Sequence, residues 1–175
     1  PMRLYGPGVD SGTFDYFTDA VNKKAQVSRG DFTASEDDNV LVQGISGDKY
    51  SLGYFGYSYY YENRAKLKAV EIDGGDGCVT PTEATINDGS YKPLSRPLFI
   101  YLSETAQQQQ HIAEFIRYYL GNEGQQLTAE VGYVPFQPEL YELALNRVET
   151  GRTGTIFGGA TPEDGTLEEV LSANQ

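Results

Sequence analysis

The sequence contains no tryptophan, one cysteine and one histidine among its 175 residues. Cys78 can form no disulfide within the chain, so a partner for it would have to lie outside. His111 follows four consecutive glutamines and is expected at the surface. Nothing places it beside Ser11, which argues against a serine–histidine hydrolase. A lone histidine also cannot build a metal cluster, and we expect no metal and no cofactor. Runs of about 18 apolar residues are absent, so the sequence predicts no membrane-spanning helix.

Basic residues are scarce as well: 13 lysines and arginines stand against 25 acidic residues, which gives a net charge of −12. This balance argues against a nucleic-acid-binding protein, because such proteins need basic surface to neutralise phosphates. It does not exclude a small anion, because a buried anion is held by local donors while the overall field mainly changes the encounter rate. The acidic run at residues 36–38 lacks the spacing of a calcium-binding EF-hand and is better explained by a helix N-terminus.

Apolar patterning alternates between strand-like runs and helical faces, which predicts an α/β fold with a mainly parallel sheet flanked by helices. The chain length suits one domain, or one lobe and part of another. The expected strands cover residues 2–5, 52–57, 67–72 and 98–102. The expected helices cover residues 12–24, 36–43, 58–63, 112–120, 122–131 and 138–149, with a short helix that begins at Thr80 and Pro81 and a terminal one near 167–171. Ser35 is expected to cap the second of these and Gly44 to end it. Gly121 is expected to end the helix at 112–120, Asn122 to cap the next one, and residues 151–165 to form a loop.

The most informative segment is the glycine-rich turn at residues 6–13, between the first expected strand and the first expected helix. A helix N-terminus carries unpaired N–H groups and a partial positive charge, and small residues let an anion approach that backbone. Ser11 and Thr13 add hydroxyl donors. The turn therefore predicts an oxyanion site, while the alternative is that Ser11 or Thr13 caps the helix and does nothing more.

Three better-known loops do not match this segment. A Walker A loop would close with Gly-Lys-Ser/Thr, which is absent. Glycines 6, 8 and 12 fit Gly-x-Gly-x-x-x-Gly, which is one residue too long for the dinucleotide-binding motif. A nucleophile elbow needs Gly-x-Ser-x-Gly, which is absent too.

Residues 10–17, Asp-Ser-Gly-Thr-Phe-Asp-Tyr-Phe, resemble the phosphate-binding loop of the substrate-binding proteins of high-affinity phosphate ABC transporters, especially their cyanobacterial-type branch. Residues 28–44, 52–57 and 91–101 are similar to further segments of that family. The resemblance implies a type II periplasmic-binding-protein-like lobe that binds inorganic phosphate and delivers it to ABC permease subunits. It also implies that the protein is not an enzyme and is exported to the periplasm or the cell surface.

The resemblance covers about the second half of such a protein, so the chain is expected to be a fragment. Residues 1–97 would form the ligand-binding lobe with the phosphate loop. Residues 98–175 would supply a returning strand and the C-terminal helices, which contribute to the hinge and the other lobe. A missing N-terminal half or a partner chain would then complete the cleft.

Within the loop, the amides of Gly12 and Thr13 and the hydroxyls of Ser11 and Thr13 are expected to donate to the anion. Many family members carry an arginine just before this loop, but residues 6–9 contain none. Arg29 is therefore predicted as the cationic clamp, since a guanidinium matches two phosphate oxygens, and the strand residue Arg3 is the less favoured substitute. The alternative for Arg29 is a surface arginine beside the acidic run.

Two further residues are predicted near the anion. Asp10 could orient the arginine or accept a hydrogen bond from protonated phosphate, which would discriminate against sulfate, or it could be an ordinary turn aspartate. Asn39 lies where the family often has an asparagine at the start of the second helix.

Two other functions stay open. One is an enzyme that acts on a phosphate ester, for which no base, nucleophile or metal site is evident. The other is an interaction module built on a phosphate-binding-like lobe.

Overall fold

The computed structural model describes residues 1–157 and 167–173, which belong to two compact units, Pro1–Arg96 and Pro97–Gln175. Unit 1 contains a three-stranded sheet of β1 (Arg3–Pro7), β2 (Thr33–Ser35) and β3 (Ser51–Gly53) in the order β2-β1-β3. Both neighbours run parallel to β1, with Tyr5 opposite Thr33 on one side and opposite Gly53 on the other. The predicted α/β fold with a parallel sheet flanked by helices is confirmed.

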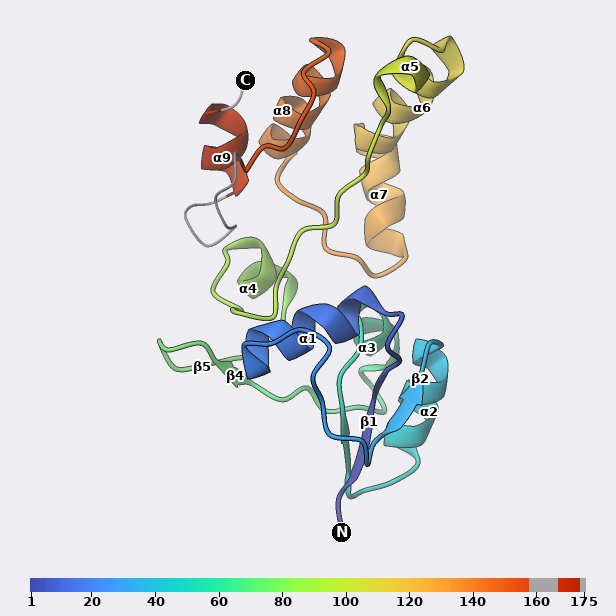
Figure 1. Cartoon of the computed structure of the whole chain (residues 1–175), viewed down its shortest axis with the longest axis vertical. Helices are drawn as coiled ribbons and strands as arrows, with labels where there is room; N and C mark the ends of the chain where they lie inside the picture. The colour runs from blue at the N-terminus through green and yellow to red at the C-terminus, as the bar shows by residue number, and fades with distance from the viewer. Residues whose placement is uncertain (158–166, 174–175) are drawn as a thin grey trace. The chain divides into compact units, whose positions relative to one another are not determined.

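Two helices, α1 (Gly12–Asn22) and α2 (Asp38–Ser46), connect these strands and lie beside the sheet (Figure 1). Phe14 of α1 and Leu41 and Val42 of α2 are buried and form the core of unit 1. Because each helix follows a strand, the turns into α1 and α2 lie at the carboxyl edge of the sheet. The glycine-rich turn after β1 is therefore at the edge where parallel sheets bind ligands.

The remainder of unit 1 holds α3 (Tyr57–Asn63), an antiparallel pair of short strands, β4 (Ile72–Asp73) and β5 (Cys78–Val79), and α4 (Glu83–Asn87). Unit 2 is helical in its described part, and its core includes the buried residues Ile116, Leu140 and Leu171. Its helices are α5 (Glu104–Gln107), α6 (Gln110–Leu120), α7 (Asn122–Glu130), α8 (Pro138–Glu149) and α9 (Leu167–Ala173). In residues 1–157 and 167–173, no helix is both long enough and apolar enough to cross a membrane.

Several predicted helix boundaries are wrong for local reasons. Asp37, not Ser35, caps α2, because its carboxylate accepts a hydrogen bond from the Asn39 amide at 2.9 Å. Gly44 does not end α2: a Cβ there would overlap the ring of Tyr5, so this glycine allows the helix to pack on β1. Elsewhere, α4 starts after Thr82, which forms a capping box with Thr85, and α7 is preceded by Gly121 without a side-chain cap.

The predicted strands match the structure less closely than the predicted helices do. Of the expected strand at residues 67–72, only Ile72 pairs, as the first residue of β4. The expected strand at residues 52–57 is shorter in the structure: β3 ends at Gly53, and α3 begins at Tyr57. Residues 98–102 form no strand, and no strand of the described residues lies beside them. The helices α6, α8 and α9 match their predictions, and the part of the expected loop over residues 158–165 lies outside the described residues.

Candidate anion-binding site

The turn after β1 leads directly into the first turn of α1. Ser11 is the N-cap of this helix: its hydroxyl oxygen accepts a hydrogen bond from the Thr13 amide at 3.2 Å, and its own amide donates to the Gly8 carbonyl at 3.1 Å. In the described part of the chain, no backbone carbonyl accepts a hydrogen bond from the Gly12 amide. A serine hydroxyl that accepts one bond still has its hydrogen to donate. Ser11 can therefore cap the helix and donate to an anion at the same time.

A carboxylate that sequence reasoning did not assign holds the other side of this turn. Glu36 lies so close to Gly8 that a Cβ at Gly8 would overlap its carboxylate. One oxygen of Glu36 accepts a hydrogen bond from the Asp10 amide at 3.3 Å. Gly8 is thus required for a close approach, and the Asp10 amide is already used inside the protein, while the Asp10 side chain is exposed.

A guanidinium that sequence reasoning also missed lies at the start of α1. A Cβ built on Gly12 would be 3.3 Å from Nη2 of Arg96. The Arg96 guanidinium carbon is 5.2 Å from the centre of the Tyr16 ring, within the range of a cation–π contact. Tyr16 and Gly12 are one helical turn apart on α1, so they share a face. The sequence showed that residues 91–101 resemble a segment of the family. It could not show that this segment contacts α1, because the residues in contact, such as Tyr16 and Pro93, are 77 positions apart.

Arg29 is not brought together with this turn. It donates to Asp31 through Nε at 2.5 Å and Nη2 at 2.6 Å, and this pairing raises the pKa of Arg29 and lowers the pKa of Asp31, although both are exposed. Two residues earlier, the Val27 carbonyl accepts a hydrogen bond from Asn22, the last residue of α1. A helix of 11 residues is about 16 Å long, so Arg29 lies toward the end of α1 that is far from Gly12.

The two remaining sequence-predicted residues take different positions. Arg3, the less favoured substitute, stands at the amino end of β1 and pairs with Asp48 at 3.2 Å. Asn39 lies in the first turn of α2, which follows β2 at the same edge of the sheet as the glycine-rich turn. Its side-chain nitrogen donates to Asp37 at 3.0 Å, and its side chain is exposed.

Known proteins resemble this chain in sequence and in fold. A family model described as a PBP superfamily domain matches residues 1–123. The chain belongs to the PBP superfamily. It is 47% identical over 175 residues to Protein SphX of Synechococcus elongatus, covering 99% of this chain and 51% of that protein. It is 36% identical over 143 residues to the phosphate-binding protein PstS of Staphylococcus haemolyticus, covering 81% of this chain and 44% of that protein.

A solved structure described as a possible phosphate binding protein from Planctomyces limnophilus aligns with a TM-score of 0.71 and 47% identity, covering 87% of this chain and 55% of that one. The predicted resemblance to phosphate-binding proteins is thus confirmed, as similarity to SphX and PstS within the PBP superfamily. The chain spans about half the length of the curated relatives it matches.

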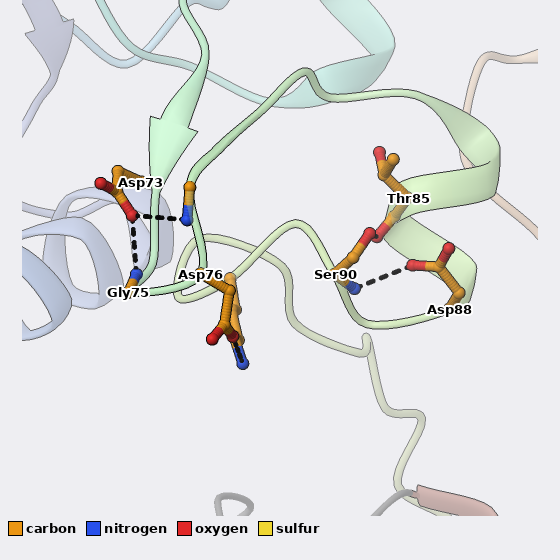
Figure 2. A network of polar contacts seen from close by, with 8 residues as sticks. Asp73, Gly75, Asp76, Thr85, Asp88 and Ser90 are labelled. Carbon is orange, nitrogen blue, oxygen red and sulfur yellow. Dashed lines mark hydrogen bonds and ion pairs between the residues drawn. The ribbon is translucent and has the colours of Figure 1, made fainter.

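A second polar network in this superfamily member lies around β4, β5 and α4 (Figure 2). One oxygen of Asp73 accepts hydrogen bonds from the amides of Gly75 at 2.8 Å and Gly77 at 3.1 Å. Asp76 pairs with Lys92 at 2.8 Å. These carboxylates are used to hold the chain itself. Among the residues that the structure describes, no three His, Cys, Asp or Glu side chains are grouped to hold a metal ion.

Asp38, in the first turn of α2, has an unusual environment. Its carboxylate accepts a hydrogen bond from the Gly56 amide at 3.4 Å, and its partial burial raises its pKa above the ordinary value more than that bond lowers it. The folded state therefore favours the protonated carboxyl. The associated stability is fully present below the ordinary pKa of about 4 and is lost as the pH rises through the raised folded value.

This shift makes a prediction for Asp38→Asn, which keeps an oxygen for Gly56 but cannot ionise. We expect the variant to unfold at a higher urea concentration than the wild type at pH 7, and the two proteins to unfold alike below about pH 4. Urea unfolding followed by circular dichroism at both pH values measures this. A less stable variant at pH 7 would show that the Gly56 bond outweighs the burial of the charge.

Proposed function

We propose that this chain is the phosphate-loop part of a solute-binding protein, which captures inorganic phosphate outside the cytoplasm and delivers it to the permease subunits of an ABC transporter. The observation that carries the proposal is the turn at residues 10–13: it lies at the carboxyl edge of a parallel sheet, begins α1, and leaves the Gly12 amide without a partner among the described residues. An anion at such a point is stabilised by backbone N–H groups and by the helix dipole.

The proposed ligand set follows from this placement. The amide of Gly12 and the hydroxyls of Ser11 and Thr13 donate to phosphate oxygens. Asp10 accepts a hydrogen bond from protonated phosphate, which favours phosphate over sulfate because sulfate carries no proton at neutral pH. Asn39 lies at the same edge of the sheet, and the proposal has it exchange its hydrogen bond to Asp37 for one to the anion. Binding of this kind involves no covalent step, so the protein acts as a carrier and not as an enzyme.

The proposed partner of unit 2 is the polypeptide that corresponds to the other half of its relatives. The exposed fractions of Leu98, Phe99, Ile100 and Tyr101 are 63%, 42%, 46% and 94%. Four consecutive exposed apolar residues without a neighbouring strand in the described part form a surface that water solvates poorly. A second lobe that covers them would complete the cleft, and the isolated chain is then expected to bind phosphate more weakly than a two-lobed protein.

Isothermal titration with phosphate tests the proposal, with sulfate as the competing anion. We expect Ser11→Ala to weaken phosphate binding about tenfold, because one hydrogen bond to a charged group is lost. Since Ser11 is also an N-cap, the matched control is Ser103→Ala, which removes the cap of α5, where the serine oxygen accepts from the Ala106 amide at 3.2 Å. That variant should bind phosphate like the wild type.

The proposal is contradicted if phosphate gives no heat at millimolar concentration, both with this chain and with a chain extended to the full length of its relatives. That result would favour an interaction module. Equal binding of sulfate and phosphate would contradict the role of Asp10.

A further inference from the structure

The ligand set of the proposed function contains no cation, because Arg29 lies away from the turn, and the structure offers another arginine that sequence reasoning missed. Arg3 and Arg29 are both paired with aspartates, at Asp48 and Asp31. Arg96 is exposed, its Nη2 lies 3.3 Å from where a Cβ of Gly12 would be, and no carboxylate of the described residues pairs with it. A guanidinium has five N–H donors in a planar fork. Those donors are therefore available beside the Gly12 amide.

The position of Arg96 is fixed by contacts with α1. The Tyr16 hydroxyl donates to the Pro93 carbonyl at 2.5 Å and lies 3.2 Å from the Ser95 carbonyl. The ring of the same tyrosine lies under the Arg96 guanidinium, at 5.2 Å from its centre. Tyr16 thus attaches the backbone before Arg96 to α1 and also supports the charged end of the side chain. A free arginine loses much rotamer freedom when it binds an anion, and this support reduces that cost.

We propose that Arg96 is the cation that pairs with phosphate at the start of α1, and that Tyr16 is the residue that positions it. This inference rests on the proposed function and names the residue that replaces the arginine missing from residues 6–9. Arg96 contributes two N–H donors to two phosphate oxygens, while the Gly12 amide and the Ser11 hydroxyl donate to the others. Gly12 allows Nη2 to lie this close to the start of α1, because a Cβ at that position would crowd it.

Titration of Arg96→Ala, Arg96→Lys and Arg29→Ala with phosphate tests the role of Arg96. We expect Arg96→Ala to weaken phosphate binding by between tenfold and about a hundredfold, as for a charge-assisted bond. Arg96→Lys keeps the charge without the fork and should recover part of the affinity. Arg29→Ala removes an exposed arginine of the same unit and should bind within about twofold of the wild type, because Arg29 lies toward the other end of α1. Glycerol 3-phosphate in parallel distinguishes inorganic phosphate from a phosphate monoester.

Tyr16→Phe tests the positioning role, since it keeps the ring under Arg96 but removes the hydroxyl. We expect it to weaken phosphate binding severalfold in the wild-type background and to have no further effect when Arg96 is alanine. A merely structural role of Tyr16 would weaken binding equally in both backgrounds, so this double-mutant cycle separates the two. Thermal unfolding of each variant identifies any that fails to fold.

The outcomes separate this inference from the function on which it rests. If the wild type binds phosphate and Arg96→Ala binds equally well, Arg96 is not the cation, while the proposed function stands. If neither this chain nor a chain extended to the full length of its relatives binds phosphate, both fail. If Arg29→Ala, and not Arg96→Ala, loses binding, the arginine predicted from the sequence is the clamp.

Discussion

Replacing Gly12 with aspartate should abolish phosphate binding, with a loss of at least about a hundredfold in affinity. The Cβ of the new residue would lie 3.3 Å from Nη2 of Arg96, so its carboxylate can pair with the guanidinium inside the protein. It would also bring a negative charge to the place proposed for the anion. Gly12 is the first residue of α1, where an acidic side chain interacts favourably with the helix dipole. The variant should therefore fold at least as well as the wild type.

Gly12→Asn is the matched control, because asparagine has the size of aspartate without its charge. We expect Gly12→Asn to weaken phosphate binding much less than Gly12→Asp, and the aspartate variant to have the higher melting temperature of the two. Titration calorimetry and thermal unfolding measure both quantities. Similar losses in the two variants would mean that space, and not charge, is critical at Gly12.

Leu41→Ala should cost unit 1 between about 2 and 5 kcal/mol of unfolding free energy. Leu41 is fully buried, with an exposed fraction of 0%, and α2 packs on β1 and on β3. Truncation loses the transfer free energy of three carbon atoms and leaves a cavity that the short sheet can fill only in part. Because the turn before α1 continues from β1, loosening of this core should also weaken phosphate binding.

The neighbouring residue provides the control for Leu41. Val40 is on the same helix but has an exposed fraction of 46%, and Val40→Ala should change stability by less than about 0.5 kcal/mol. Hydrogen exchange of the β1 and α2 amides in increasing urea measures the unfolding free energy of unit 1 separately from that of unit 2. Equal destabilisation by the two variants would show that α2 is not held by the burial of Leu41.

The sequence alone determined what depends on neighbouring residues. The apolar face of α6 and its end at Gly121 follow from helical periodicity and from the low helix propensity of glycine, and both are confirmed. The order of strand, glycine-rich turn and helix at residues 3–22 is confirmed too. The sequence left open whether Ser11 or Thr13 caps this helix, and the structure shows that Ser11 does. The similarity to phosphate-binding proteins could also be recognised from the sequence, because the motif at residues 10–17 is contiguous.

The tertiary structure alone decided which side chains meet at that motif. Glu36 reaches Gly8, and Arg96 reaches Gly12, through packing between segments that are far apart in the chain. Arg29 was predicted because a guanidinium matches two phosphate oxygens and residues 6–9 contain no arginine. The chain returns along α1 after that helix, which takes Arg29 toward the other end of the helix. The expected strand at residues 98–102 failed for a related reason. A strand needs a neighbour for its hydrogen bonds, and no strand of the described residues lies beside this one. Local patterns fix which element forms, whereas contacts between distant elements depend on how the whole chain packs.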